Sequence, residues 1–152
     1  MRMRDAGMSW YQPGIVLQHE IPGQKPMNET ARLLLILGSF NSALVVVLGA
    51  FGAHALKHRL DENMLQVYQT ATQYHFYHAL GLLIIGILAL HLPSSSLLRW
   101  SGLLLLAGII LFCGSLYVLA LSNLRWPGMI TPLGGVAFIL GWAIMLLALV
   151  KQ

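Results

Sequence analysis

Residues 33–53 read LLLILGSFNSALVVVLGAFGA, and this stretch decides the fold. It contains no charged residue, and about 20 predominantly apolar residues are what a helix needs to cross roughly 30 Å of hydrocarbon. Because no water is present at that depth to satisfy exposed backbone groups, the segment is expected to be helical. Three further apolar runs follow, near residues 75–92, 97–121 and 130–150. The sequence therefore predicts an all-α fold, an integral membrane bundle of four helices.

The composition of the chain agrees with lipid as its surrounding solvent. Charged residues make up 9% of the sequence and hydrophobic residues 57%, with a mean hydropathy of +0.72, whereas roughly a quarter of a soluble domain is charged. The net charge of +4 comes from nine basic and five acidic residues. The basic residues lie singly near the ends of apolar runs, where positive charge sets membrane orientation. We therefore expect the lipid bilayer to be a partner of the chain, and nucleic acid not to be one.

The first residues differ in character from the rest. Residues 1–26 are mixed and rich in turn-forming pairs, without an apolar face long enough to fold alone, so we expect a disordered N-terminal extension there. The four-span membrane domain is expected to occupy residues 27–152. Asn28 and Glu29 supply helix-start chemistry directly after Met27. A translation start at Met27 is therefore an alternative interpretation.

A short amphipathic segment separates the first two apolar runs. Asp61 is placed to cap a helix, and apolar residues then recur at spacings of three and four as far as Tyr74. The sequence predicts a helical segment over residues 56–74. It either lies along the membrane interface or extends the second helix out of the membrane.

Four spans place both termini on the same side of the membrane. More basic residues fall on that side than on the other, and the positive-inside rule then favours cytoplasmic termini. The basic residues on the terminal side are Arg2, Arg4, Lys25, Arg32, Arg99 and Lys151, and those on the opposite side are Lys57, Arg59 and Arg125.

Small residues on the first helix predict close helix packing. In lipid, helices associate through close backbone approach at small residues and through hydrogen bonds between polar side chains. Asn41 lies near the middle of the helix, where its amide needs an interhelical partner, and a pathway or ligand site is the alternative role. The residues expected to pack against other helices are Gly38, Asn41, Ser42, Gly49, Gly52 and Ala53.

Four of the six histidines lie between the first and second spans. His54 ends the first helix while His75 and His78 begin the second, so an antiparallel pair would bring them to the same membrane face. Neutral imidazole is a common ligand of zinc, copper, iron and nickel. The pattern therefore suggests a metal or haem site made by His54, His75 and His78, with His58 in an auxiliary role.

The rest of such a metal site is missing from the sequence. A structural zinc ion takes four ligands and a catalytic one three plus water, yet the only cysteine, Cys113, lies inside a distant apolar run. Asp61 and Glu62 could add oxygen ligands. The histidines equally suit the headgroup boundary, because an imidazole has an apolar body and a polar tip. On this second interpretation no cofactor is expected, and the histidines pack and form hydrogen bonds.

No established catalytic motif occurs in the sequence. It has no nucleophile elbow, phosphate-binding glycine loop or zinc-protease motif. The leading hypothesis is a structural or interaction component without enzymatic activity, with a membrane-protein partner or a homo-oligomer as its context. The alternatives are a metal- or haem-binding membrane module and a small-solute transporter.

Two stretches, GAFGAHALKHRL and YQTATQYHFYHALGLL, carry a family resemblance. With the later GGVAFILGW, they resemble the domain of unknown function 423 family, small bacterial inner-membrane proteins whose eukaryotic relative is called transmembrane protein 256. The resemblance covers essentially residues 27–151. It implies a multi-pass protein of the bacterial plasma (inner) membrane, and it carries no biochemical activity over to this chain.

Overall fold

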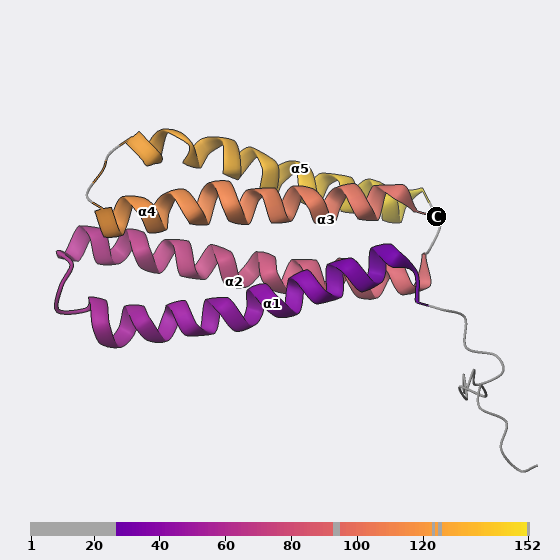
Figure 1. The fold of residues 1–152 in the computed structure, drawn as a ribbon. Helices are drawn as coiled ribbons and strands as arrows, with labels where there is room; N and C mark the ends of the chain where they lie inside the picture. Colours follow the sequence, from indigo (N-terminus) through magenta and orange to yellow (C-terminus); the bar gives the residue numbers. More distant parts are fainter. Residues whose placement is uncertain (1–26, 93–94, 123, 125, 152) are drawn as a thin grey trace, which may run out of the picture.

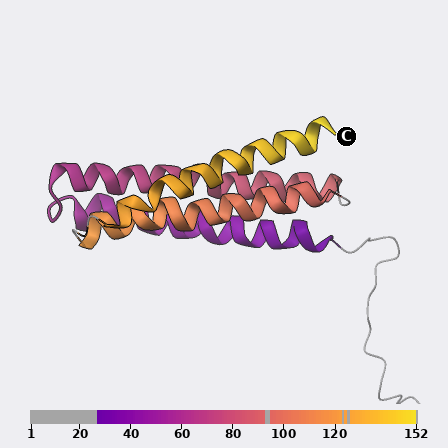
Figure 2. The same cartoon turned by 90° about the horizontal axis from the view of Figure 1, so that it is seen from above.

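The computed structural model describes residues 27–92, 95–122, 124 and 126–151. The predicted N-terminal extension, residues 1–26, lies outside this described part. Four long helical rods run side by side in alternating directions, with α1 beside α2 and α3 beside α5 (Figure 1). Seen from above, α5 crosses the other helices obliquely (Figure 2). The elements are α1 (Glu29–Phe51), η1 (Gly52–Leu56), α2 (Glu62–His91), α3 (Ser96–Gly108), η2 (Ile109–Cys113), α4 (Gly114–Ser122), η3 (Trp126–Met129) and α5 (Thr131–Val150).

These elements confirm the predicted all-α bundle of four membrane-spanning helices. The rods Glu29–Leu56, Glu62–His91, Ser96–Ser122 and Trp126–Val150 are each long and apolar enough to cross a membrane. Two of them contain one wide turn of π-helix, η1 at the end of α1 and η2 between α3 and α4. Such turns often mark functional sites in helices.

The second span begins earlier than its apolar run suggested. The helix starts at Glu62 and not near residue 75, and Asp61 caps it by accepting a hydrogen bond from the Met64 amide at 2.9 Å. The amphipathic segment is therefore the first part of α2, which decides between its two predicted placements. With 30 residues, α2 is about 45 Å long, which exceeds the roughly 30 Å of hydrocarbon.

Glycines set the close antiparallel contact between α1 and α2. A Cβ atom added to Gly38 would lie 2.8 Å from the Leu83 side chain, and one added to Gly52 would lie 2.6 Å from the Tyr68 ring. Gly49 has more room, since its nearest neighbour would be the Thr72 methyl group at 3.6 Å. At the other end of this pair, the Asn28 amide donates to the Ala89 carbonyl, and the start of α1 is thereby tied to the end of α2.

The other half of the bundle is closed by similar contacts. A Cβ atom on Gly108 would lie 2.3 Å from the Phe138 ring, and the buried Ser101 hydroxyl donates to the Gly141 carbonyl at 2.7 Å. These contacts join α3 to α5. Between the halves lies one apolar core that includes Leu34, Leu82, Ile85, Leu98 and Leu105.

The outside of the bundle is apolar along most of its length. Phe40 on α1 and Ile139 on α5 are 63% and 69% exposed, as expected for side chains that face lipid. Within the described residues, charged side chains are confined to the ends of the rods. They are Glu29, Arg32, Lys57, Arg59, Asp61, Glu62, Arg99 and Lys151.

Candidate functional site

The most polar part of the interior is centred on His75. Its side chain is only 2% exposed. Nε2 lies 3.0 Å from Oδ1 of Asn41 on α1, and Nδ1 lies 3.4 Å from the hydroxyl of Tyr117 on α4. One imidazole thereby links three helices.

The neighbours of His75 determine where its proton lies. The Asn41 amide nitrogen donates to the Leu37 carbonyl at 2.8 Å, so Asn41 Oδ1 is the atom that accepts a hydrogen bond from His75. His75 therefore donates its Nε2 proton to Asn41, while Nδ1 lies beside the Tyr117 hydroxyl, which donates to Thr72. Each ring nitrogen thus has a polar neighbour within hydrogen-bonding distance.

The polar contacts continue from Tyr117 toward the α1–α2 connection. The Tyr117 hydroxyl lies 3.5 Å from that of Thr72, and Thr72 in turn donates to the Tyr68 carbonyl at 3.0 Å. The Tyr68 hydroxyl donates to the Leu48 carbonyl at 2.8 Å. We call Asn41, Tyr68, Thr72, His75 and Tyr117 the polar network.

Sequence reasoning identified two members of this network and missed three. Asn41 and His75 were singled out. Tyr68 and Thr72 precede His75 by seven and three residues, the spacing of one helix face, so that spacing was a usable signal once the helix was known to start at Glu62. For Tyr117, which lies in an otherwise apolar run, the sequence offers no such signal.

His78 has a different environment from His75. Its Nδ1 donates to the Tyr74 carbonyl at 2.7 Å, within the same helix. The ring stacks on Phe138 of α5, with centroids 3.4 Å apart and planes inclined by 13°. His78 therefore packs as an aromatic side chain between α2 and α5.

The structure does not bring the predicted metal ligands together. His54 and His58 are exposed near the α1–α2 connection, while His75 and His78 are buried in the bundle. Within the described residues, no group of three or more histidine, cysteine, aspartate or glutamate side chains could hold a metal ion.

The position of His54 follows from where α2 begins. Gly52 lies against Tyr68, so His54 lies level with the first turns of α2. His75 follows Tyr68 by about two turns. The prediction placed these histidines together because it started the second helix near residue 75.

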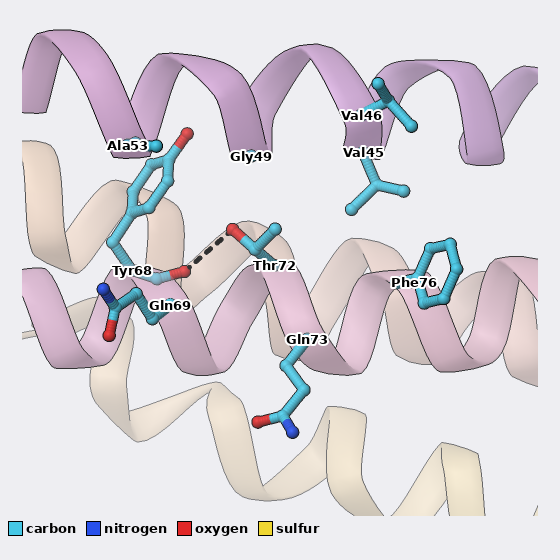
Figure 3. A pocket seen from close by; sticks show the side chains of 10 residues that line it. Val45, Val46, Gly49, Ala53, Tyr68, Gln69, Thr72, Gln73 and Phe76 are labelled. Atoms are coloured by element: carbon cyan, nitrogen blue, oxygen red, sulfur yellow. Dashed lines mark hydrogen bonds between the residues drawn. The ribbon is translucent and has the colours of Figure 1, made fainter.

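The remaining predicted packing residues lie at the edge of the α1–α2 contact. The Ser42 hydroxyl is buried and makes no hydrogen bond within the described part of the chain. Ala53 is exposed and, with Gly49 and Gly52, lines a groove of about 330 Å³ between α1 and α2. Figure 3 shows Tyr68 and Thr72 projecting from α2 toward α1 beside this groove.

Comparison with known proteins assigns the sequence of this chain to a family. The sequence profile described as "Protein of unknown function (DUF423)" matches residues 48–135, a range that contains most of the polar network. The chain belongs to the DUF423 family. No solved structure matches it.

Relatives of the chain are described as membrane proteins. UPF0382 membrane protein YwdK of Bacillus subtilis is 48% identical over 120 residues, which cover 79% of this chain and 98% of the relative. UPF0382 membrane protein SAB0533 of Staphylococcus aureus is 45% identical over 120 residues, covering 79% and 97%. Together with the four candidate spans, these matches identify this DUF423 chain as a multi-pass membrane protein.

Proposed function

We propose that this DUF423 protein is a non-catalytic component of the bacterial inner membrane that acts through contacts with other membrane proteins or with copies of itself. One observation carries the proposal. His75, the most deeply buried of the predicted ligand histidines, uses both ring nitrogens in hydrogen bonds to Asn41 and Tyr117. An imidazole with a polar neighbour at each nitrogen joins helices, and a metal ion or a substrate would have to displace one of these neighbours.

The proposal gives the histidines and the interior polar groups a structural role. A buried polar group in a membrane needs a partner, because no water is present to provide one. The polar network supplies such partners at the junction of α1, α2 and α4. On this proposal the chain needs no resident metal or haem, and its termini face the cytoplasm as the charge distribution favours.

The outer face of α1 is the surface that we assign to such contacts. Ser39, Ala43 and Ala50 are exposed there, and small residues allow the backbone of a partner helix to approach closely. In the apolar window of this span, 22% of the residues are buried in the bundle, compared with 44% for the second span. The first span therefore has the most surface left to cover.

Photocrosslinking in native membranes tests the proposal. In a Cys113→Ser background, a benzophenone is attached to cysteine at position 39 or 43, or at the control position Ile139 on α5. Positions 39 and 43 are expected to give the same protein adduct of discrete mass, because both lie on the small-residue face. The adduct should be much weaker from Ile139, which is 69% exposed but lies on another helix.

Two results would contradict this proposed function. Equal labelling from all three positions would show random collisions in the membrane and no preferred face. Reproducible turnover or solute flux by the purified, reconstituted chain alone would show that it acts without a partner.

A further inference from the structure

The groove between α1 and α2 has an apolar end and a polar end. Val45, Val46 and Phe76 line it toward the middle of the bundle. Gln69 and Thr72 line it toward the α1–α2 connection. The space exists because Gly49 has no side chain, and a Cβ atom there would approach only the Thr72 methyl group, at 3.6 Å. Its shape and lining suit an amphiphile that lies parallel to the helices.

The polar end of the groove lies at a depth where the other helices expose apolar side chains. Gly52 lies against Tyr68, so the neighbouring Phe51 and Gln69 are nearly level, and Phe51 is 47% exposed. An amide at the edge of the hydrocarbon is costly unless it is hydrogen-bonded. Gln73 donates to the Tyr77 hydroxyl at 2.8 Å, but Gln69 makes no side-chain hydrogen bond within the described residues. Gln69 therefore has donors available for an acceptor from outside the chain.

Charges of both signs lie along the chain beyond the polar end of the groove, near the α1–α2 connection. Lys57 follows Ala53 by about one turn of π-helix, and Glu62 precedes Gln69 by about two turns of α-helix. Both side chains are exposed, and neither forms an ion pair with a described residue. Arg59 and Asp61 on the connection add one further charge of each sign. The formal charges of these four residues therefore cancel, and they complement a headgroup that carries a phosphate and an ammonium group.

We propose that the groove binds one glycerophospholipid with a zwitterionic ammonium–phosphate headgroup. One acyl chain lies along Val45, Val46 and Phe76, and an ester carbonyl accepts a hydrogen bond from the Gln69 amide. The phosphate lies toward Lys57 and the ammonium group toward Glu62. This lipid site does not depend on the proposed protein contacts, because it involves a different ligand and can exist in an isolated chain.

Native mass spectrometry of the full, untagged chain in mild detergent tests the lipid site. Phosphatidylethanolamine and phosphatidylglycerol are the two probes. The first variant is Gly49→Leu, and its control is Ala50→Leu, a neighbouring position outside the groove. The second variant is Gln69→Leu, and its control is Gln66→Leu, about one turn earlier in α2. We expect the wild-type chain and both controls to retain one phosphatidylethanolamine. Binding should weaken about tenfold in Gly49→Leu, because the leucine side chain fills the space that the acyl chain takes.

Each other outcome overturns the lipid site. Unchanged retention in Gly49→Leu and Gln69→Leu would show that lipid binds elsewhere. Equal retention of phosphatidylethanolamine and phosphatidylglycerol would contradict the match between the charged residues and a zwitterionic headgroup. A benzophenone attached at position 69 that crosslinks to protein instead of lipid would show that a protein occupies the groove. Should Gly49→Leu not fold, the comparison of Gln69→Leu with Gln66→Leu decides alone. All of these results are independent of the crosslinking at positions 39 and 43.

Discussion

Gly134→Ala is expected to destabilise the protein strongly, while the same change at the adjacent Gly135 is expected to be neutral or stabilising. A Cβ atom on Gly134 would lie 2.3 Å from the backbone nitrogen of Phe112 and 2.7 Å from its Cα. The backbone of η2, in which Phe112 lies, cannot move aside as the end of a flexible side chain can. On Gly135 the nearest atom would be 3.9 Å away, an ordinary contact.

The two glycines form a matched pair because both lie in α5. Each gains about 1 kcal/mol of helix propensity on becoming alanine, so the difference between the variants isolates the contact with η2. Overpacking typically costs about 1–3 kcal/mol and occasionally more, and a clash with backbone belongs at the upper end. Thermal unfolding in mild detergent, followed by circular dichroism, measures the difference. Equal midpoints for the two variants would show that α5 and η2 are not in close contact.

His75→Leu is expected to cost more stability than the corresponding change at His54, His58 or His78. It leaves Asn41 Oδ1 without its partner and removes the contact of the Tyr117 hydroxyl with Nδ1, and an unsatisfied buried polar group costs about 1–3 kcal/mol. His54→Ala serves as the control, because His54 is exposed and a surface change is usually within about 0.5 kcal/mol. Reversible unfolding in mixed detergent micelles gives both values.

The double variant tests whether Asn41 and His75 act on each other. Replacing both by leucine removes donor and acceptor together, so the cost should be smaller than the sum of the single costs. Coupling energies between polar side chains in membrane helices average about 0.6 kcal/mol. Strict additivity of the two changes would contradict the hydrogen bond between their side chains.

Much of the fold could be predicted from the sequence because lipid imposes a simple rule. A long, predominantly apolar run must become a helix in hydrocarbon, and residues 33–53, 97–121 and 130–150 follow that rule closely. The start of the second helix stayed open between two placements, because its first turns, from Glu62 onward, are amphipathic and lie outside the apolar run. A hydropathy pattern predicts which residues lie in the hydrocarbon, whereas the capping residue determines where the helix begins.

The interior site could be predicted only in part, for a related reason. Residue spacing fixes which side chains share a face of one helix, but which faces meet depends on helix register and rotation. His75 was identified as a residue of the headgroup boundary or a metal ligand, yet its partner Tyr117 comes from a helix that the sequence does not align with it. His54 was grouped with His75 because the metal-site hypothesis began the second helix at His75. The register set by Gly52 against Tyr68 separates them.

The central claim is that His75 joins helices and does not bind metal, and ¹⁵N spectra of the histidine side chains test it most directly. The full, untagged chain is labelled in mild detergent, and the His75 signals are assigned by their loss in His75→Leu. The structure predicts a proton on Nε2, donated to Asn41, with signals unchanged when Zn²⁺ is added. Zinc-dependent shifts of the His75 nitrogens, or a proton on Nδ1 in place of Nε2, would contradict the hydrogen bonds to Asn41 and Tyr117 and the function proposed from them.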